Sequence, residues 1–167
     1  MHDDRLREVY AVAYPRLVVQ LVGVTGNPAE AEDVVMEAFA RAVPRRSSFH
    51  DADNPEAWLR TVAVNVARSR WRRMLRWAHV LPELVTPTSY ADLPEERLAL
   101  LAALRQLPAT QREAIALHHL ADLPVAEVAF TLGVPEGTVK ARLARGRAAL
   151  AEVLTDSSKE EDHARAD

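Results

Sequence analysis

Glycine and proline interrupt this chain at points where a helix could begin or end, and this punctuation constrains the fold more than any other feature. Between the interruptions, apolar residues recur at helical spacing, and no convincing run of alternating β-branched residues appears. Because that spacing places apolar side chains on one face of a helix, the pattern predicts an all-α protein. The periodicity is lost in a proline-bearing stretch near the middle, so we expect two small helical domains joined by a linker.

The first domain is predicted to span residues 1–77. Pro15 should break or kink its first helix, because proline lacks an N–H and its ring clashes with the preceding turn. Asn27 should cap the next helix, with Glu30 three residues later as in a capping box, and Pro44 should end it. We then expect a loop from Arg45 to Asp53 and a third helix from Asn54 to about Arg76.

The second half of the chain begins with residues 78–94, which hold several prolines and no apolar stripe and are predicted to form the linker. Residues 95–155 are predicted to form the second domain. Its helices are expected at about 94–106, 109–121, 124–132 and 136–151. The tail of residues 156–167 is polar and acidic, so we expect it to be disordered, since it has little apolar surface to bury.

The composition argues against several classes of protein. The chain has no cysteine, so it contains neither a disulfide framework nor a thiolate metal site. It has no helix-long apolar run, and charges occur throughout its first twenty residues, so we expect no membrane insertion and a cytoplasmic location. The six histidines lack metal-ligand spacing, and neither a phosphate-cradling glycine loop nor a serine nucleophile elbow is present. We therefore expect no metal, no cofactor, no small-molecule substrate and no enzymatic activity.

The charges of the chain are segregated, although its formal net charge is only -3. The stretches Ala57–Leu81 and Gly137–Ala151 contain no acidic residue and hold ten of the 21 basic residues. A polyanion responds to charge within a Debye length, about 8 to 10 Å, so the local charge matters more than the sum. The segregation predicts at least one surface that binds a polyanion.

The most specific local pattern is PVAEVAFTLGVPEGTVKARLARGR, from Pro124 to Arg147, which predicts a helix-turn-helix. Ala129 is small where the two helices would cross, and Gly133 permits the positive φ of the tight turn. The second helix should present polar and basic side chains to a DNA major groove or to its phosphates, namely Thr138, Lys140, Arg142 and Arg145. The alternative is an ordinary helical hairpin with a basic exterior.

A helix rich in arginine and tryptophan is predicted between Trp58 and Trp77. Guanidinium groups can bind phosphates, and an exposed aromatic ring can stack on a base. Trp58 shares an apolar stripe with Leu59 and Val62, so we expect it in the core and the arginines largely on other faces. For Trp71 and Trp77, stacking on nucleic acid and packing against the linker both remain open.

An acidic face, formed by Glu30, Glu32, Asp33 and Glu37, is predicted on the second helix of the first domain. Such carboxylates can be a solvated surface or a docking face for a basic partner. No histidine lies close in sequence to complete a metal or acid–base site, which disfavours a catalytic role.

Several blocks, in order, carry a family resemblance: AEAEDVVMEAFARA, RRSSF, NPEAWLRTVAVNVARSRWRR, a proline-bearing linker and LPATQREAIALHHLADLPVAEVAFTLGVPEGTVKARLARGRAAL. Over roughly residues 5 to 152, the chain resembles the extracytoplasmic-function (ECF) sigma factors, minimal bacterial transcription initiation factors. The resemblance implies promoter-specific initiation with strand opening, and core RNA polymerase, promoter DNA and an anti-sigma protein as partners. The linker would thread through the polymerase toward its active-site and RNA-exit region.

The resemblance also implies roles for individual residues. The polymerase-docking segment would contain Glu32, Asp33, Val34, Glu37 and Phe39. The segment that captures a flipped base of the minus-ten element and the helix that supports strand opening would contribute Arg45, Arg46, Ser47, Ser48, Phe49, Trp58, Arg60, Asn65 and Arg68. The helix that reads the minus-thirty-five element would contribute Glu136, Gly137, Thr138, Lys140, Arg142 and Arg145.

The chain departs from the family pattern at Met36, Val43, Pro44 and Val64, which bears on the polymerase and minus-ten contacts. Two other functions compete with the sigma-factor reading. One is a self-sufficient regulator that dimerises through its first domain and binds a two-fold symmetric operator with the helix-turn-helix. The other is an enzyme with a carboxylate site around Glu32 and Asp33, which metal-dependent turnover would reveal.

Overall fold

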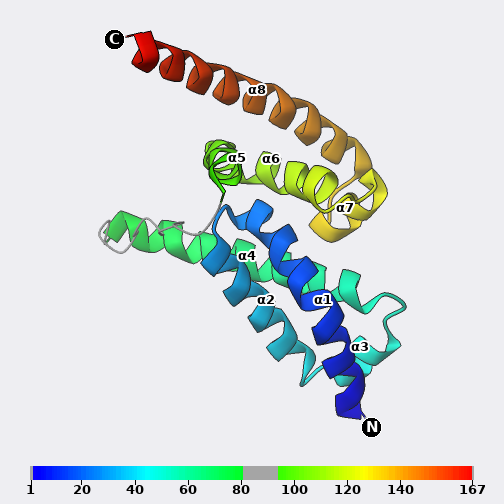
Figure 1. Cartoon of the computed structure of the whole chain (residues 1–167). Coiled ribbons are helices and arrows are strands. Elements are labelled where there is room, and N and C mark those ends of the chain that lie inside the picture. The colour runs from blue at the N-terminus through cyan, green and yellow to red at the C-terminus, as the bar shows by residue number, and fades with distance from the viewer. Residues whose placement is uncertain (1, 81–93, 167) are drawn as a thin grey trace. The chain divides into compact units, whose positions relative to one another are not determined.

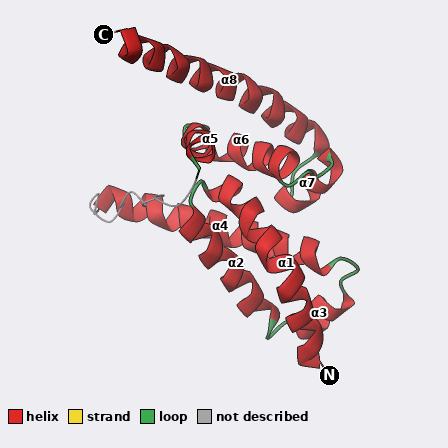
Figure 2. Ribbon diagram, in the orientation of Figure 1, coloured by secondary structure: helices red, strands yellow, loops and turns green. Residues whose placement is uncertain are grey.

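The computed structural model describes residues 2–80 and 94–166, which form only helices and the loops between them (Figures 1 and 2). The all-α prediction is therefore confirmed. The chain divides into two compact units, Met1–Ala91 and Asp92–Asp167. Most of the predicted linker, residues 81–93, lies outside the described residues.

The first unit contains four helices within residues 2–80, namely α1 (His2–Thr25), α2 (Pro28–Ala42), α3 (Arg46–Asp51) and α4 (Pro55–Val80). Helices α1, α2 and α4 pack against one another, because each carries an apolar stripe that only its neighbours can cover. The core of this unit includes Leu17, Leu21, Val34, Val35, Leu59, Val64 and Val66.

Helix α1 continues through Pro15, so the prediction of a break there is wrong. Ala13 and Leu17 are buried on the two sides of the proline, whose own ring is exposed. Burial of the apolar residues of α1 outweighs the cost of an internal proline, about 3 kcal/mol. The helix ends at Thr25, and Gly26 follows with a positive φ of 70°.

The termini of the next helices follow the predicted signals in part. The Asn27 side chain accepts a hydrogen bond of 3.1 Å from the Glu30 N–H, which confirms the N-cap of α2. The expected loop at residues 45–53 instead contains α3, because burial of Phe49 holds this short segment against the unit. Helix α4 passes the predicted end at Arg76 and reaches Val80, since no glycine or proline occurs between Pro55 and Pro82.

The second unit consists of α5 (Glu95–Arg105), α6 (Ala109–Ile115), the π-helix η2 (Ala116–Leu120), α7 (Val125–Leu132) and α8 (Glu136–Ala166). Gly133 ends α7 with φ 66°, as the predicted helix-turn-helix requires. The core of the unit includes Leu104, Leu117, Val128, Val139 and Leu143.

Helix α8 continues to Ala166, so the prediction of a disordered tail is wrong. The chain has neither glycine nor proline after Gly146, and Lys159, Glu160, Glu161, Ala164 and Arg165 of its tail are good helix formers. The Thr155 and Ser158 hydroxyls donate hydrogen bonds to the carbonyls of Ala151 and Leu154, four residues earlier, instead of interrupting the helix. Little apolar surface is buried in this extension, which is exposed along most of its length.

Candidate partner and nucleic-acid interfaces

The acidic face of α2 contains an arginine that comes from α4. The guanidinium of Arg70 forms two hydrogen bonds with Glu30, at 2.7 and 3.2 Å. It also lies 3.6 Å from an Asp33 oxygen and 3.7 Å from a Glu37 oxygen. Like charges one helical turn apart destabilise a helix by about 0.2–0.5 kcal/mol per pair, so Arg70 offsets the repulsion within this face.

The electrostatic environment of Arg70 reflects this geometry. Partial burial lowers its pKa, but the hydrogen bond to Glu30 and the charges of Glu30, Asp33 and Glu37 together raise the pKa above its ordinary value. On the other side, Glu37 accepts a 2.7 Å hydrogen bond from Arg41. Glu32 is exposed, and the side chain of Asp33 retains 66% of its accessible surface, so this face still presents carboxylates to solvent.

The five predicted docking residues do not lie on one surface. Val34 and Phe39 are buried, and the Phe39 ring contacts Tyr10 at a centroid distance of 5.0 Å. These two residues therefore fix the position of α2, whereas Glu32 and Asp33 are exposed and Glu37 is half-buried. Beside them lies an exposed apolar side chain, Met36, which retains 49% of its accessible surface and is one of the departures from the family pattern.

The remaining departures have different environments. Val43 is exposed at the end of α2, Pro44 is exposed in the following turn, and Val64 is fully buried in α4. Val64 thus contributes to the core.

The phenol of Tyr14 lies beside the acidic face. Burial raises its pKa above the ordinary value, and the charges of Glu32, Tyr10 and Asp33 raise it further, so Tyr14 stays neutral.

Helix α3 has an exposed polar face, and its buried Phe49 holds it against the first unit. The Phe49 ring is buried and makes an edge-to-face contact with Trp58 at 5.7 Å. Arg5 of α1 donates a 2.9 Å hydrogen bond to the carbonyl of His50, which ties the end of α3 to a residue 45 positions away. The side chains that this arrangement leaves exposed are Arg45, Arg46, Ser47 and Ser48.

The residues of α4 that are predicted to contact DNA differ in exposure. Asn65 is exposed and Arg68 is half-buried. Arg60 retains only 5% of its accessible surface, and it donates a 2.8 Å hydrogen bond to Gln20 and lies 3.5 Å from Glu56. The expectation that the arginines lie on other faces than the core is therefore wrong for Arg60, because Gln20 of α1 supplies a buried acceptor that the sequence pattern does not reveal.

The tryptophans of α4 also differ in burial. Trp58 is half-buried, so the prediction that it belongs to the core is correct only in part, since its ring borders Phe49. Trp71 and Trp77 are exposed, with 39% and 56% of their surface accessible. Within residues 2–80, exposed aromatic and guanidinium groups thus occur together on the second half of α4.

The helix-turn-helix has the arrangement that its sequence predicts. Val139 and Leu143 face the core of the second unit, and Ala129 is buried at 7% exposure. Along α8, the residues predicted to face DNA are exposed or half-buried: Glu136, Gly137, Lys140 and Arg145 are exposed, and Thr138 and Arg142 are half-buried.

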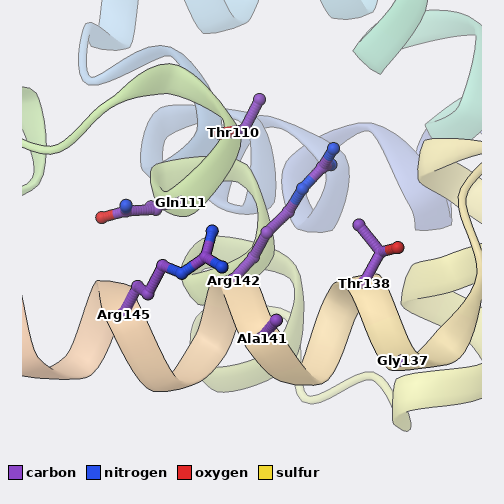
Figure 3. Close-up of a pocket in the computed structure, with 7 residues that line it drawn as sticks. All are labelled: Thr110, Gln111, Gly137, Thr138, Ala141, Arg142 and Arg145. Carbon is purple, nitrogen blue, oxygen red and sulfur yellow. The ribbon is translucent and has the colours of Figure 1, made fainter.

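A pocket of about 460 Å³ opens between the start of α6 and α8 (Figure 3). Its lining combines Arg142, Arg145 and Thr138 of α8 with Thr110 and Gln111 of α6. Arg142 Nη1 and Gln111 Oε1 have no hydrogen-bond partner within the part of the chain that the structure describes. Two guanidinium groups beside a hydroxyl and an amide suit a phosphate.

Thr110 and Gln111 were missed from the sequence. The signal available was a pair of polar residues directly after Pro108, at the start of a helix. Such a pair is common at helix starts, where polar side chains often accept hydrogen bonds from the free backbone N–H groups of the first turn. The pair by itself therefore does not indicate a ligand. Only the packing of α6 beside α8 brings these residues to the arginines.

The two adjacent histidines of η2 have structural partners. His118 Nδ1 donates to the carbonyl of Leu123 at 2.7 Å, and His119 Nε2 lies 3.3 Å from Arg147 Nη1. Burial, His118 and Arg147 lower the pKa of His119. Among the described residues, no group of three or more histidine or acidic side chains is arranged to hold a metal ion.

Within residues 2–80 and 94–166, no helix combines the length and the apolar character that crossing a membrane requires.

The comparisons with known proteins follow the division into two units. The family described as Sigma-70 region 2 matches residues 2–78, and the family Sigma-70, region 4 matches residues 97–150. The ECF RNA polymerase sigma factor EcfG of Rhodopseudomonas palustris is 32% identical over 159 residues, which cover 90% of this chain and 86% of that protein. The ECF RNA polymerase sigma factor SigL of Mycobacterium tuberculosis is 38% identical over 128 residues, 71% of each chain.

Solved structures give the same result. The sigma factor RpoE from Bartonella quintana, in complex with the anti-sigma factor NepR, is similar with a TM-score of 0.74 and 27% identity, covering 89% of this chain and 96% of that one. CnrH, in complex with the cytosolic domain of CnrY, has a TM-score of 0.68 at 24% identity, covering 92% and 90%, and supports the fold alone. With two sigma-70 regions in order and relatives at these identities, the chain belongs to the ECF sigma factors of bacterial RNA polymerase.

Proposed function

We propose that this ECF sigma factor binds core RNA polymerase through α2 and recognises two promoter elements with separate surfaces in its two units. The observation that carries the proposal is the separation of charge. Exposed carboxylates lie on α2, whereas exposed cationic side chains lie on α3 and α4 in the first unit and on residues 137–151 of α8 in the second. A protein with one duplex-binding surface needs neither the acidic face nor the second cationic surface.

For polymerase binding, the contacts are assigned to the carboxylates of Glu32 and Asp33, which are exposed, and of Glu37, which is half-buried. Met36 adds an exposed apolar group between them. Val34 and Phe39 support this surface from the core. Charge complementarity with a basic partner would speed association and select the partner.

For the minus-ten element, the contacts are assigned to α3 and to the exposed part of α4. Arg45 and Arg46 can bind phosphates, Ser47 and Ser48 can donate hydrogen bonds to a flipped base, and Asn65 and Arg68 extend the surface along α4. Phe49, Trp58 and Arg60 hold this surface in place through the contacts described above. Opening a duplex costs roughly 1–2 kcal/mol per base-pair step, which contacts to unstacked bases offset.

For the minus-thirty-five element, α8 is assigned to the major groove, with Glu136, Gly137, Thr138 and Lys140 near its start. The pocket beside Arg142 and Arg145 is assigned to a phosphate of the DNA backbone, with Thr110 and Gln111 as additional contacts. Neither unit should hold a promoter tightly alone. Attachment to polymerase makes the two weak affinities act together as an effective concentration.

Further features of the proposal come from the family. The similar structure from Bartonella quintana contains an anti-sigma factor, and we extend that kind of partner to this chain. The chain acts where polymerase acts, in the cytoplasm, and it contributes binding energy and no catalytic residue of its own. The predicted linker would run between the two promoter surfaces.

The test is reconstitution with core RNA polymerase. The purified chain should co-elute with core enzyme and direct runoff transcription from a promoter selected with the reconstituted holoenzyme. Replacing Glu32 and Asp33 with lysine should abolish co-elution, while binding of the variant to isolated minus-thirty-five DNA should stay at the wild-type level. If the chain ignores core polymerase and binds a two-fold symmetric duplex tightly by itself, the proposal is wrong and the self-sufficient regulator is correct.

A further inference from the structure

Arg70 lies within the acidic face that we assign to polymerase, although it belongs to α4. Its two hydrogen bonds to Glu30 form a fork, which is a strong and directional arrangement for an arginine and a carboxylate. Its contacts with Asp33 and Glu37 are longer, at 3.6 and 3.7 Å. The acidic face of the free chain is therefore already partly neutralised from within.

We propose that Arg70 competes with the basic groups of the docking partner for Asp33 and Glu37 and so sets how tightly the partner binds. This inference rests on the proposed function, because it concerns the same surface. Arg70 stays anchored on Glu30, while its two longer contacts give way to cations supplied by the partner. The residue thus tunes the docking surface without being a docking contact.

The exposure of the groups makes such an exchange feasible. The Arg70 side chain retains 32% of its accessible surface, and that of Asp33 retains 66%, so a partner can reach the carboxylates without unfolding the unit. Glu37 is shared between Arg70 and Arg41, which holds it at 2.7 Å from the opposite side. Among the described residues, Arg70 and Arg41 form ion pairs with Glu30, Asp33 and Glu37, and Glu32 is exposed. The four carboxylates of this face outnumber these two cations, which leaves a negative excess for a basic partner.

The sequence alone suggests a different role for Arg70. It lies in the acid-free run of α4, where it resembles its neighbours Arg72 and Arg73 as a phosphate-binding group. The structure shows Arg72 and Arg73 exposed, whereas Arg70 turns to a helix that begins more than 40 residues earlier. Arg73 therefore provides a matched control, because its removal changes the net charge of the same helix equally.

The experiment compares Arg70→Gln with Arg73→Gln in the full chain, after circular dichroism has confirmed the fold. Two probes are titrated at several salt concentrations: core RNA polymerase, and a helical peptide with arginines along one face. Arg70→Gln should bind both probes up to about fivefold more tightly at low salt and with a steeper salt dependence, whereas Arg73→Gln should bind nearly as the wild type does. Arg70→Lys, which restores the charge, should return both affinities toward the wild-type values.

A measurement on the wild-type chain removes any dependence on how well the variant folds. The side-chain Nη–H groups of Arg70, which lie beside Asp33 and Glu37, should give a nuclear magnetic resonance signal that shifts as the arginine peptide is added, while the Nε–H held by Glu30 stays protected. An unshifted signal at saturating peptide, or equal or weaker peptide binding by folded Arg70→Gln, would overturn the role of Arg70. Tighter peptide binding by Arg70→Gln, with no binding of polymerase to any variant, would confirm competition at this face and overturn the proposed function instead.

Discussion

The two acid-free stretches of this sigma factor, Ala57–Leu81 and Gly137–Ala151, hold arginines in different environments. In the first unit, Arg60 and Arg70 bind side chains of other helices, and Arg60 is nearly inaccessible to solvent. In the second unit, Arg142 and Arg145 line an open pocket beside the helix that we assign to promoter DNA. We therefore expect an arginine in an acid-free helix to contact DNA only if no other helix supplies it with an acceptor.

The strongest test of this contrast is Arg60→Ala. The substitution leaves the Gln20 amide buried without its charged donor, so we expect the first unit to lose about 2–4 kcal/mol of its free energy of unfolding. Urea denaturation followed by circular dichroism measures this change. Arg73→Ala, at an exposed position on the same helix, should leave the stability nearly unchanged. Equal stability of Arg60→Ala and the wild type would show that Arg60 is available to DNA after all.

In the second unit, a comparable loss of stability should come from packing. A Cβ at Gly146 would lie 2.8 Å from Ile115 Cγ1 on α6, so Gly146→Ala should destabilise this unit by about 1–3 kcal/mol despite the better helix propensity of alanine. Gly137→Ala is the matched control, because nothing lies within 4 Å of its added Cβ. The midpoint temperature of thermal unfolding should be lower than that of the wild type for Gly146→Ala and higher for Gly137→Ala. Two stabilised variants would mean that α6 shifts freely away from α8.

If the second unit binds DNA as proposed, replacing Arg142 should change the affinity for minus-thirty-five DNA and leave the stability of the unit unchanged. Arg142→Ala should lower the slope of log affinity against log salt by about one unit if the contact is to a phosphate, or cost about 1–3 kcal/mol with relaxed base preference if it is to a guanine. Filter binding to minus-thirty-five DNA over a salt series distinguishes the two. An unchanged affinity and slope would remove Arg142 from the interface.

Gln111 tests whether the pocket beside Arg142 belongs to that interface. Gln111→Ala should weaken the same minus-thirty-five complex less than Arg142→Ala does, because an amide contributes a neutral hydrogen bond of about 0.5–1.5 kcal/mol. The exposed Gln106 lies outside the pocket, so Gln106→Ala serves as the control in the same assay. Equal affinities for both variants would confine the DNA contacts to α8.

The smallest expected effect concerns pH. The pKa of His119 is lowered by burial, His118 and Arg147, so the unfolded chain binds this proton more readily than the folded one. Stability from this group is complete above the unfolded pKa, 6.5, and decreases as the pH falls below it. His119→Gln should flatten that decrease in thermal unfolding between about pH 7 and 5, and Arg147→Gln should flatten it in part. If His119→Gln loses as much stability at low pH as the wild type does, other titratable groups cause that loss.

The sequence by itself determined most of the helices, the caps at Asn27 and Gly133, and the family. Asn27, Gly133 and the apolar stripes act over a few neighbouring residues, so their consequences can be predicted from local spacing alone. The same locality explains the error at Pro15, whereas the error in the tail has a local cause. In the first case packing outweighed a breaker, and in the second the helix-forming residues of the tail outweighed its lack of apolar surface.

Only the tertiary structure decided which charged side chains are available to a partner. The pairs Arg60–Gln20 and Arg70–Glu30 each join residues 40 positions apart, and the pocket joins α6 to α8. A charged group carries the same charge in every environment, so its type and spacing cannot show whether its partner lies on another helix, in DNA or in polymerase. Packing brings the acceptor to the donor, and that contact distinguishes an arginine that stabilises the fold from one that reads a promoter.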